Sequence, residues 1–354
     1  MGTDSRGGDW DMVKIKVSET RNVIAQLFGK LGMNAQEAQI MAKVLVETDQ
    51  RGVMTHGIVA APRYLRMIRA GEMKANVEYE VVRDNGTIAV WDGKRSAGQV
   101  IGYFGMEETI AKARKNGVGI VCIKGANHFG ALAYYAQMAQ KAGMVGIVLS
   151  SAVATVAPYG GCEKMIGNNP IAVAAPAGKE IPPSLDMAMA TVANGKITNM
   201  MLQGKTDIPE GWGLDRDGVP TTKMSDFYTV PIMAGYKGWA MDVMVDVLAG
   251  VLFGGATGIR AADKCGGPGV FMMALDVDSF NEREKYNEDM DARISELKNS
   301  KPAKGSKGIT MPGENSTRKL IESEEAGYLE ILPEIVASVN ACAAEMGVEP
   351  IETF

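Results

Sequence analysis

The spacing of apolar residues changes along the chain, and this change predicts the order of its elements. Apolar residues recur at helical spacing from Ser18 to Leu31, which predicts a first amphipathic helix. Asn34, with Glu three residues later, has the pattern of a capping box and predicts a second helix that ends near Gly52. A third helix is expected over 58–70, because Gly71 is a natural stop.

From Tyr79 to Trp91 the pattern becomes an alternation around Asp84-Asn85-Gly86, which predicts a β-hairpin. Strands and helices alternate after this hairpin, which favours a layered α/β fold. Further helices are expected over 98–116, 131–142, 237–252, 281–299 and 333–346. Further strands are expected over 119–123, 145–150, 171–175, 185–188 and 270–277. The segment 300–316 is rich in Lys, Gly, Ser and Pro and predicts a long loop.

Composition narrows the class of protein. The 354 residues are 46% hydrophobic and 22% charged, as in globular proteins, and the net charge of −5 offers no basic surface for nucleic acid. No apolar run is long enough to span a membrane, and Met1–Trp10 lacks the apolar core of a signal peptide. We therefore expect a globular protein that is located in the cytoplasm. The four cysteines match no metal or disulfide pattern and are expected to be free thiols.

Only two histidines are present, and both lie in polar, glycine-containing sequences: Thr55-His56-Gly57 and Asn127-His128-Phe129-Gly130. Imidazole titrates near neutral pH, as general acid–base catalysis requires. A histidine hydrogen-bonded to the backbone of a turn fits either sequence equally well. Two histidines without carboxylates at ligand spacing do not make a typical zinc site, so no metal is expected.

Arg51 precedes Thr55 by four residues at the end of the second expected helix. This spacing can place both side chains on one face. A guanidinium binds a carboxylate through two parallel hydrogen bonds, so Arg51 suits an acidic substrate. The alternative, which the local sequence favours, is a surface arginine paired with Asp49 or Glu47.

The common nucleotide-binding motifs are absent. There is no G-x-x-x-x-G-K-[ST] and no G-x-G-x-x-G after a strand, so an ordinary Rossmann domain is not expected. Three other stretches have the composition of a phosphate cradle: Pro158-Tyr159-Gly160-Gly161, Gly167-Asn168-Asn169-Pro170 and Gly235-Tyr236-Lys237-Gly238. The last of them opens an expected helix, where phosphate is favoured. Each stretch taken alone also fits an ordinary turn.

Several stretches together resemble the malate/L-lactate dehydrogenase-like family, which is distinct from the Rossmann-type malate and lactate dehydrogenases. They are, in chain order, residues 49–57, 127–130, 166–172, 185–188, 194–196, 211–215, 220–222, 235–239 and 312–314. The family includes malate, sulfolactate and ureidoglycolate dehydrogenases, diketogulonate reductase and cyclic-imine carboxylate reductases. Thr55 stands where this family usually has Ser, and Asn168 where it commonly has Thr.

The resemblance implies a fold and a division into domains. The expected fold class is α/β, with a mixed-sheet, non-Rossmann nicotinamide-binding domain and an α-helical domain built from the N- and C-terminal segments. We place the helical domain at 12–78 with 281–354, and the α/β domain at 79–280. The resemblance also implies NAD or NADP as cofactor, a small-molecule substrate and a homodimer.

The resemblance further implies roles for individual residues. His128 is the first candidate for acid–base proton transfer and His56 the second, while Arg51 and Thr55 are expected to bind substrate. The residues expected to line the cofactor site are Ser150, Asn169, Asp186, Met187, Ala188, Tyr236, Lys237, Gly313 and Glu314.

The expected function is hydride transfer between NAD(P) and a small 2-hydroxy acid or 2-keto acid of the malate, lactate or sulfolactate type. One alternative is an NAD(P)H-dependent reductase of a cyclic imine carboxylate or diketo sugar acid, which would use the same residues. A non-catalytic dinucleotide-binding protein is an alternative of another class. The presence of both histidines and Arg51 argues against it.

Overall fold

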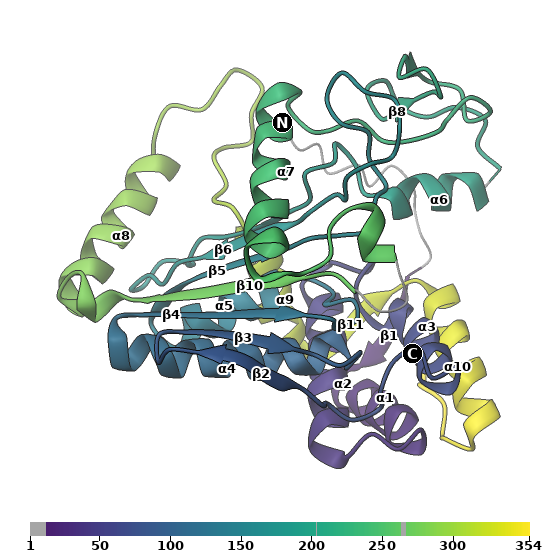
Figure 1. The fold of residues 1–354 in the computed structure, drawn as a ribbon, viewed down its shortest axis with the longest axis horizontal. Helices are drawn as coiled ribbons and strands as arrows, with labels where there is room; N and C mark the ends of the chain where they lie inside the picture. Colours follow the sequence, from purple (N-terminus) through teal and green to yellow (C-terminus); the bar gives the residue numbers. More distant parts are fainter. Residues whose placement is uncertain (1–11, 203, 263–266) are drawn as a thin grey trace. The chain divides into compact units, whose positions relative to one another are not determined.

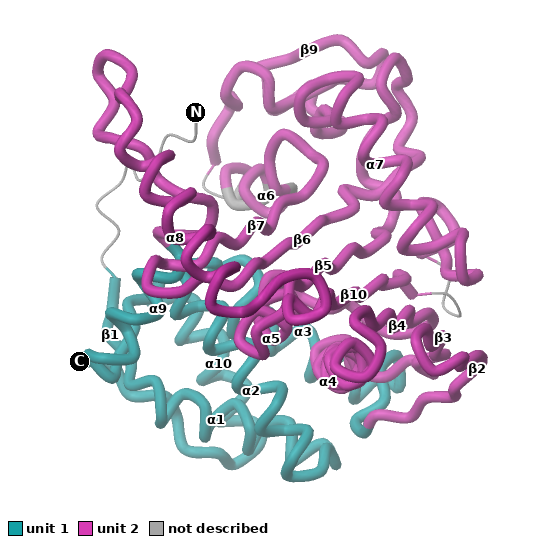
Figure 2. The backbone as a smooth tube through the Cα atoms, turned by 90° about the vertical axis from the view of Figure 1, so that its left-hand side faces the viewer, with its two compact units in different colours: residues 1–76, 316–354 teal, residues 77–315 magenta. Residues whose placement is uncertain are grey.

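The chain divides into two compact units, which Figure 2 shows in different colours. Unit 1 consists of Met1–Asn76 with Ser316–Phe354, and unit 2 of Val77–Asn315. The computed structural model describes residues 12–202, 204–262 and 267–354. The predicted N-terminal extension, Met1–Trp10, lies outside these described residues.

Unit 1 draws its elements from both ends of the chain and is mainly helical. They are β1 (Val13–Lys16), α1 (Val17–Lys30), α2 (Ala35–Gln50), the 3-10 helix η1 (Ile58–Ala60), α3 (Ala61–Arg69), most of α9 (Glu314–Ala326), β11 (Tyr328–Ile331) and α10 (Pro333–Met346). Asn34 caps α2 as predicted, because its side chain accepts a hydrogen bond from the N–H of Glu37. β1 and β11 form an antiparallel ribbon in which Val13 faces Ile331.

Unit 2 contains a seven-stranded mixed sheet, in agreement with the predicted fold class. Its order is β2-β3-β4-β10-β5-β6-β7, and a small separate ribbon is formed by β8 and β9. Only β3 and β4 are parallel among these neighbouring strands. The strands are β2 (Glu80–Asp84), β3 (Ile88–Asp92), β4 (Val118–Lys124), β5 (Met144–Ser150), β6 (Ile171–Ala174), β7 (Ser184–Met187), β8 (Gly213–Leu214), β9 (Pro220–Thr221) and β10 (Val270–Asp276).

Helices cover both faces of this sheet (Figure 1). The helices of unit 2 are α4 (Gly98–Asn116), α5 (Ala133–Lys141), α6 (Asn194–Leu202), α7 (Tyr236–Ala249) and α8 (Arg283–Lys298), with short 3-10 turns at Val251–Phe253, Ile259–Ala262 and Val277–Ser279. Glycines within the strands let α4 and α5 approach one face closely. A Cβ at Gly119 would lie 2.1 Å from Thr109 O, and one at Gly146 would lie 2.3 Å from Ala136 O.

Helix α7 covers the opposite face of the sheet through an apolar cluster. Its Val245 and Ala249 pack with Cys122, Leu149 and Phe271, which come from β4, β5 and β10. The sheet is therefore buried on both faces, which accounts for the nearly continuous apolar sequence of its central strands.

The boundary between the units differs from the one that the sequence suggested. The expected helical domain resumed at 281, whereas unit 1 resumes at Ser316, so α8 belongs to unit 2. Side-chain contacts account for this placement. Arg283 bonds Asp276, Asp278 and the carbonyl of Gly143. The Asp291 carboxylate accepts backbone hydrogen bonds from residues 178–180. A sequence pattern can predict a helix here but not these partners.

Candidate active site

The strand directions bring several predicted site residues to one edge of the sheet. β4, β5 and β7 run in the same direction, because β10 is antiparallel to β4 and β5, and β6 is antiparallel to β5 and β7. Val270, at the start of β10, pairs with both Ile123 and Ser150. Ile171, at the start of β6, pairs with Met187 at the end of β7. This edge, called the site edge below, carries the His128 loop, Ser150, Asn169 and Asp186–Ala188.

The site edge is long compared with a small acid. Between β4 and β7 it spans four strand spacings, or about 19 Å at roughly 4.8 Å each. The chain after β4 crosses this distance, because the N–H of Ala133, five residues after His128, bonds the Asp186 carboxylate at 2.8 Å. A dinucleotide is long enough to follow the whole edge, whereas a three- or four-carbon acid can occupy only part of it.

The loop that carries His128 is held mainly by its backbone. It is joined to the loop after β3, residues 93–96, by N–H groups that donate from Gly93 to Lys124 O (2.7 Å), from Arg95 to Gly125 O (2.7 Å) and from Asn127 to Ser96 O (3.0 Å). The Asn127 amide also donates to Arg95 O at 2.8 Å. These bonds fix the chain on the amino-terminal side of His128.

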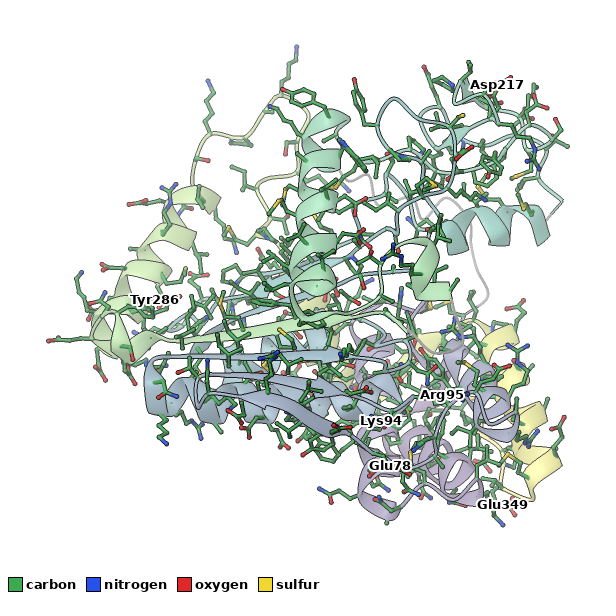
Figure 3. All side chains as sticks on the ribbon, in the orientation of Figure 1. Glu78, Lys94, Arg95, Asp217, Tyr286 and Glu349 are labelled. Atoms are coloured by element: carbon green, nitrogen blue, oxygen red, sulfur yellow. The ribbon has the colours of Figure 1, made fainter. Side chains whose placement is uncertain are left out.

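The loop of residues 93–96 adopts a strained backbone conformation where it forms these hydrogen bonds. Lys94 and Arg95, labelled in Figure 3, have left-handed φ angles of 45° and 65°. Such angles are unfavourable for residues with a Cβ and persist only where other contacts impose them. Both the N–H and the C=O of Arg95 bond the His128 loop, so the strain accompanies the fixing of that loop.

Close packing by α4 and α5 completes the support of the His128 loop. A Cβ at Gly98 would lie 2.3 Å from the carbonyl oxygens of both Asn127 and His128. The hydroxyl of Tyr135, on α5, donates to Phe129 O at 2.6 Å. His128 itself is half-buried. A half-buried imidazole on a fixed backbone suits a proton-transfer group.

Asp186 lies at the other end of the site edge, beside the start of α5. Its carboxylate accepts the N–H of Ala133 at 2.8 Å, and a carboxylate is favoured at a helix amino terminus. The residue is exposed overall, yet protein atoms exclude part of the water around its carboxyl. This desolvation raises the pKa of Asp186 to about 6, against hydrogen bonds from Ala133 and Leu132. Asp186 therefore titrates close to physiological pH.

Ser150 and Asn169 lie on the site edge but are buried and engaged. The Ser150 hydroxyl donates to Gly269 O at 3.1 Å. Asn169 is fully buried; its Oδ1 accepts the N–H of Ala152 at 2.9 Å, and its Nδ2 donates to Asp246 Oδ1 at 2.8 Å. The side chains of both residues therefore shape the edge from within, whereas Asp186 is open to a ligand.

Tyr236 and Lys237 are exposed in the first turn of α7. Helix α7 is preceded by two residues with left-handed φ, Ala234 at 52° and Gly235 at 60°. The backbone before the helix is tied to the site edge, since Met233 N donates to Met189 O at 2.8 Å. The two exposed side chains thus stand at the positive end of a 14-residue helix.

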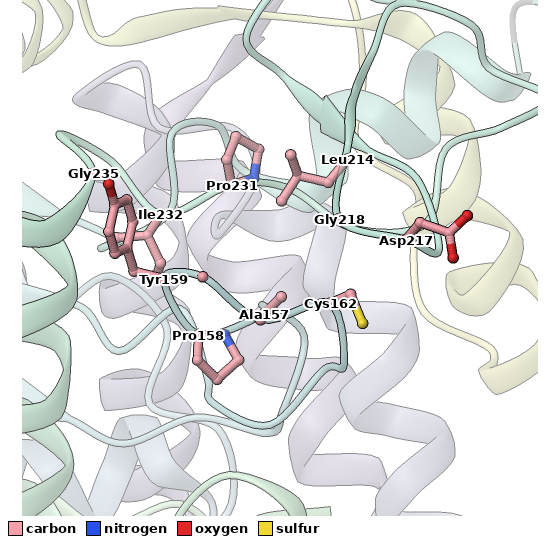
Figure 4. A pocket seen from close by; sticks show the side chains of 12 residues that line it. Ala157, Pro158, Tyr159, Cys162, Leu214, Asp217, Gly218, Pro231, Ile232 and Gly235 are labelled. Atoms are coloured by element: carbon pink, nitrogen blue, oxygen red, sulfur yellow. The ribbon is translucent and has the colours of Figure 1, made fainter.

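Two of the predicted glycine-rich stretches line one cavity (Figure 4). Pro158–Gly161 and Gly235 contribute to this space of about 400 Å³, together with Cys162, Leu214, Asp217 and Gly218. A Cβ at Gly235 would lie 3.6 Å from the ring of Tyr159, so the two stretches are in contact. None of His128, Ser150 or Asp186 lines the cavity, which therefore adjoins the start of α7 rather than the reacting end of the site edge.

Gly313 and Glu314 dock at the opposite end of β7. A Cβ at Gly313 would lie 2.4 Å from Ser184 O, at the first residue of the strand. Glu314 is buried and accepts hydrogen bonds from Lys298 Nζ at 2.9 Å and from Met311 N at 3.1 Å. Ser184 and Met187 are three residues apart, or about 10 Å. The structure thus does not bring this pair to the site edge itself.

Unit 1 carries the other predicted catalytic and substrate residues, just after α2. Five consecutive polar residues at the end of this helix are buried: Glu47, Thr48, Asp49, Gln50 and Arg51. Each has a hydrogen-bond partner in the same unit. The buried polar end of α2 forms a rigid base for the following loop.

His56 lies in that loop with its imidazole half-buried. The Thr55 hydroxyl and His56 Nδ1 are 2.9 Å apart. Burial and, second, the positive charge of Arg63 lower the pKa of His56. The imidazole is therefore neutral at pH 7, the form that can accept a proton.

Arg51 is paired with Glu47, as one of the two sequence interpretations expected, but it is buried and does not lie on the surface. Its Nη2 lies 3.0 Å from Glu47 Oε1, but its buried Nε has no acceptor among the described residues. Lys319 of α9 lies over the adjacent glycine, since a Cβ at Gly52 would come within 2.8 Å of Lys319 Nζ. The loop therefore has two cations beside it.

Sequence reasoning did not predict that two carboxyl groups are buried. Asp49 is 4% exposed, and burial raises its pKa to about 8, against a hydrogen bond from Ile58. Asp242, on α7, is fully buried; desolvation and then the charge of Asp246 raise its pKa to about 8. A run of polar residues at the end of an amphipathic helix was the available signal for Asp49.

The described residues contain no cluster of three or more His, Cys, Asp or Glu side chains that could hold a metal ion. No helix in the described ranges has the length and apolar character needed to cross a bilayer. Cys122, Cys162 and Cys342 are free thiols, as predicted, and Cys265 lies outside the described residues.

Comparison with known proteins identifies the family of this chain. Residues 15–340 match the malate/L-lactate dehydrogenase family. A malate dehydrogenase of Pyrococcus horikoshii is 34% identical, over 96% of this chain and 98% of its own length. The ureidoglycolate dehydrogenase (NAD(+)) of Escherichia coli K12 is 31% identical, over 91% and 94%. The solved sulfolactate dehydrogenase of Methanocaldococcus jannaschii superposes with a TM-score of 0.87 at 32% identity, covering 95% of this chain and 98% of that one. The chain therefore belongs to the malate/L-lactate dehydrogenase family of oxidoreductases.

Proposed function

We propose that the protein interconverts a small 2-hydroxy acid and its 2-keto acid with NAD or NADP. The observation that carries the proposal is the site edge, where the backbone-fixed loop of His128 leads directly to the Asp186 carboxyl, which accepts the N–H of Ala133, five residues after His128. An imidazole on a fixed backbone, beside a carboxyl that can accept hydrogen bonds from ribose hydroxyls, suits a nicotinamide cofactor with its reacting end near the imidazole. The relatives named malate and sulfolactate dehydrogenases support the choice of substrate class.

The described residues fit a nicotinamide cofactor. Tyr236 and Lys237 stand at the positive end of α7, where a diphosphate is stabilised. The Asp186 carboxylate can accept hydrogen bonds from ribose hydroxyls, and Met187 and Ala188 are half-buried beside it. The buried side chains of Ser150 and Asn169 stabilise the site edge through their hydrogen bonds to the protein. The cofactor, when bound, supplies or accepts the hydride, and the protein positions and shields it.

A proton must move at the substrate oxygen for each hydride transferred. His128 is our first candidate for this role, because its loop follows β4 at the site edge and its backbone is fixed on both sides. His56 is the second, since its neutral imidazole has Nδ1 engaged by Thr55. The histidine that does not transfer the proton would hydrogen-bond the substrate.

The substrate carboxylate is assigned to Arg51. Its Nε lacks an acceptor among the described residues, and a buried donor without a partner is costly until an acceptor arrives. Lys319, half-buried over Gly52 and without an ion-pair partner among the described residues, adds a second positive charge. Two cations at one loop favour a substrate with more than one anionic group, such as malate or sulfolactate.

A substrate panel tests the proposal directly. Purified protein would be mixed with NAD or NADP and with malate, lactate, sulfolactate or ureidoglycolate, while the absorbance of the reduced nicotinamide is followed. Keto acids and cyclic imine carboxylates would be tested in the reverse direction. Turnover of a hydroxy acid supports the proposal. Turnover of cyclic imines alone would replace it with the reductase alternative, and cofactor binding without any turnover would indicate a non-catalytic protein.

A further inference from the structure

Asp49 occupies an unusual place at the end of α2. The side chain is only 4% exposed, and its Oδ2 accepts the N–H of Ile58 at 2.7 Å. Its Oδ1 is buried without a hydrogen-bond partner among the described residues. A carboxyl in such a place is costly to bury as an anion.

The carboxyl also lies directly on the backbone that follows His56. A Cβ at Gly57 would lie 1.9 Å from Asp49 Oδ1 and 2.1 Å from its Cγ. Only glycine can therefore occupy position 57 while Asp49 keeps its place. Asp49 touches the residue after His56 and bonds the next one, so it fixes the backbone on the carboxyl-terminal side of the imidazole.

Burial, and not a neighbouring charge, keeps this carboxyl neutral at pH 7. Glu47 and Arg51, on the same helix, are paired with each other. Beyond the helix, His56 lies in the loop, Arg63 follows on α3, and Lys319 of α9 lies over Gly52. Burial outweighs the hydrogen bond from Ile58 and raises the pKa of Asp49 to about 8. The acid therefore loses its proton only under mildly alkaline conditions.

We propose that Asp49 is a positioning residue for His56, because it fixes the loop of His56 through the backbone of Gly57 and Ile58. The importance of this role for turnover rests on the proposed function, but the contact itself does not. Ionisation of Asp49 would place an uncompensated buried charge against the loop. The loop would then shift, and His56 would lose its alignment with the substrate.

Nuclear magnetic resonance of the histidine ring tests the contact without any turnover. With His128→Asn as background, a single imidazole remains to be observed. Its resonance should show its own titration below the ordinary pKa of histidine and a second inflection near pH 8, where Asp49 ionises. Asp49→Asn should abolish the second inflection and leave the first in place. Asp242→Asn is the matched control, since Asp242 is equally buried with a similar pKa, and it should leave both inflections unchanged.

Turnover provides the second readout, once a substrate is known. Wild-type kcat/KM for the acid should fall above about pH 8, and Asp49→Asn should remove that fall while keeping kcat/KM at pH 7 within about threefold. Asp49→Leu should lower kcat/KM at least tenfold, mainly through KM, with an unchanged Kd for the reduced cofactor; if it does not fold, the Asn variant still decides. The proposal is overturned if the inflection near pH 8 is missing from the wild type or persists in Asp49→Asn. It is also overturned if the Leu variant keeps full kcat/KM. Absence of any turnover, with the resonance pattern intact, would count against the proposed function alone.

Discussion

The two histidine loops are fixed by different means. The His128 loop is held by backbone hydrogen bonds to a strained neighbouring loop and by glycine contacts with α4. The His56 loop has local turn hydrogen bonds, such as His56 N–H to Val53 O at 3.1 Å, and is held in addition by side chains, namely the buried carboxyl of Asp49 and the Thr55 hydroxyl at Nδ1. A backbone support has no titratable group, whereas a carboxyl support can be released by pH. The difference suggests a constant position for His128 and a pH-dependent one for His56.

The largest effect is expected from removing the imidazole that transfers the proton. His128→Asn should lower kcat by about 10²-fold or more, a typical contribution of general acid–base catalysis. The Kd for the reduced cofactor, measured by fluorescence, should change little. His56→Asn is the matched variant and should mainly raise KM for the acid. If instead His56→Asn is inactive and His128→Asn keeps full turnover, the two roles must be exchanged.

A smaller effect is expected from disturbing the backbone support of His128. Gly98→Ala would place a Cβ 2.3 Å from the Asn127 and His128 carbonyl oxygens. The loop must move, so kcat should fall about tenfold, and stability by about 1–3 kcal/mol. Gly29→Ala, also in a helix but with no atom within 4 Å of the added Cβ, is the control for stability and should not lower Tm. Full kcat in Gly98→Ala would show that the loop tolerates displacement.

A further decrease in effect is expected for substitution of Arg51, the cation beside the His56 loop. Arg51→Lys keeps the charge but loses the planar fork and the Nε donor. KM for the hydroxy acid should rise about tenfold, which corresponds to about 1.4 kcal/mol, while cofactor affinity is kept. Arg69→Lys, at an exposed pair with Glu345, is the control and should behave as wild type. If Arg51→Lys loses substrate affinity and cofactor affinity equally, Arg51 does not bind the substrate carboxylate, and its ion pair with Glu47 has a structural role only.

The smallest effect is expected at the far end of the site edge. The pKa of Asp186 is raised to about 6, so the carboxyl gains its charge as pH rises from 5 to 7. Cofactor affinity should rise about three- to tenfold over that range, because the charged fraction of the carboxyl rises from about a tenth to about nine tenths and so limits the gain. Fluorescence titrations at both pH values would measure it, with Asp186→Asn expected to flatten the profile. Asp84→Asn, in the exposed hairpin, is the control; an unchanged profile in Asp186→Asn would remove Asp186 from the cofactor site.

Much of the fold could be predicted because its signals are local. The helix over 98–116, the hairpin at Asp84-Asn85-Gly86 and the Asn34 cap all follow from spacing and turn chemistry, and the structure confirms them. The ribbon of β1 and β11 was not predicted, because its two four-residue strands lie more than 300 positions apart in the sequence. Helix α9 was missed because its sequence is mostly charged and polar, with little apolar periodicity.

The candidate site divides in the same way. The two histidine motifs and the glycine stretches are visible in the sequence, and the order of strands places His128 and Asp186 on one edge. Burial is a property of tertiary structure, so the sequence could not show that Asn169 and Ser150 are covered, or that Glu314 docks at the opposite end of β7. It also could not distinguish Asp49, buried against Gly57, from an ordinary acidic residue on a helix surface.

The central claim is that a hydride passes between the carbon that bears the hydroxyl group and the nicotinamide. Transfer of deuterium tests it most directly. A 2-hydroxy acid found active in the panel, with deuterium on its hydroxyl-bearing carbon, would be incubated with the oxidised cofactor, and the reduced cofactor analysed by mass spectrometry. The proposed function predicts one deuterium atom retained in each reduced nicotinamide, with slower turnover than for the unlabelled acid when hydride transfer limits the rate. Loss of the deuterium to water would contradict hydride transfer and with it the function proposed for this protein.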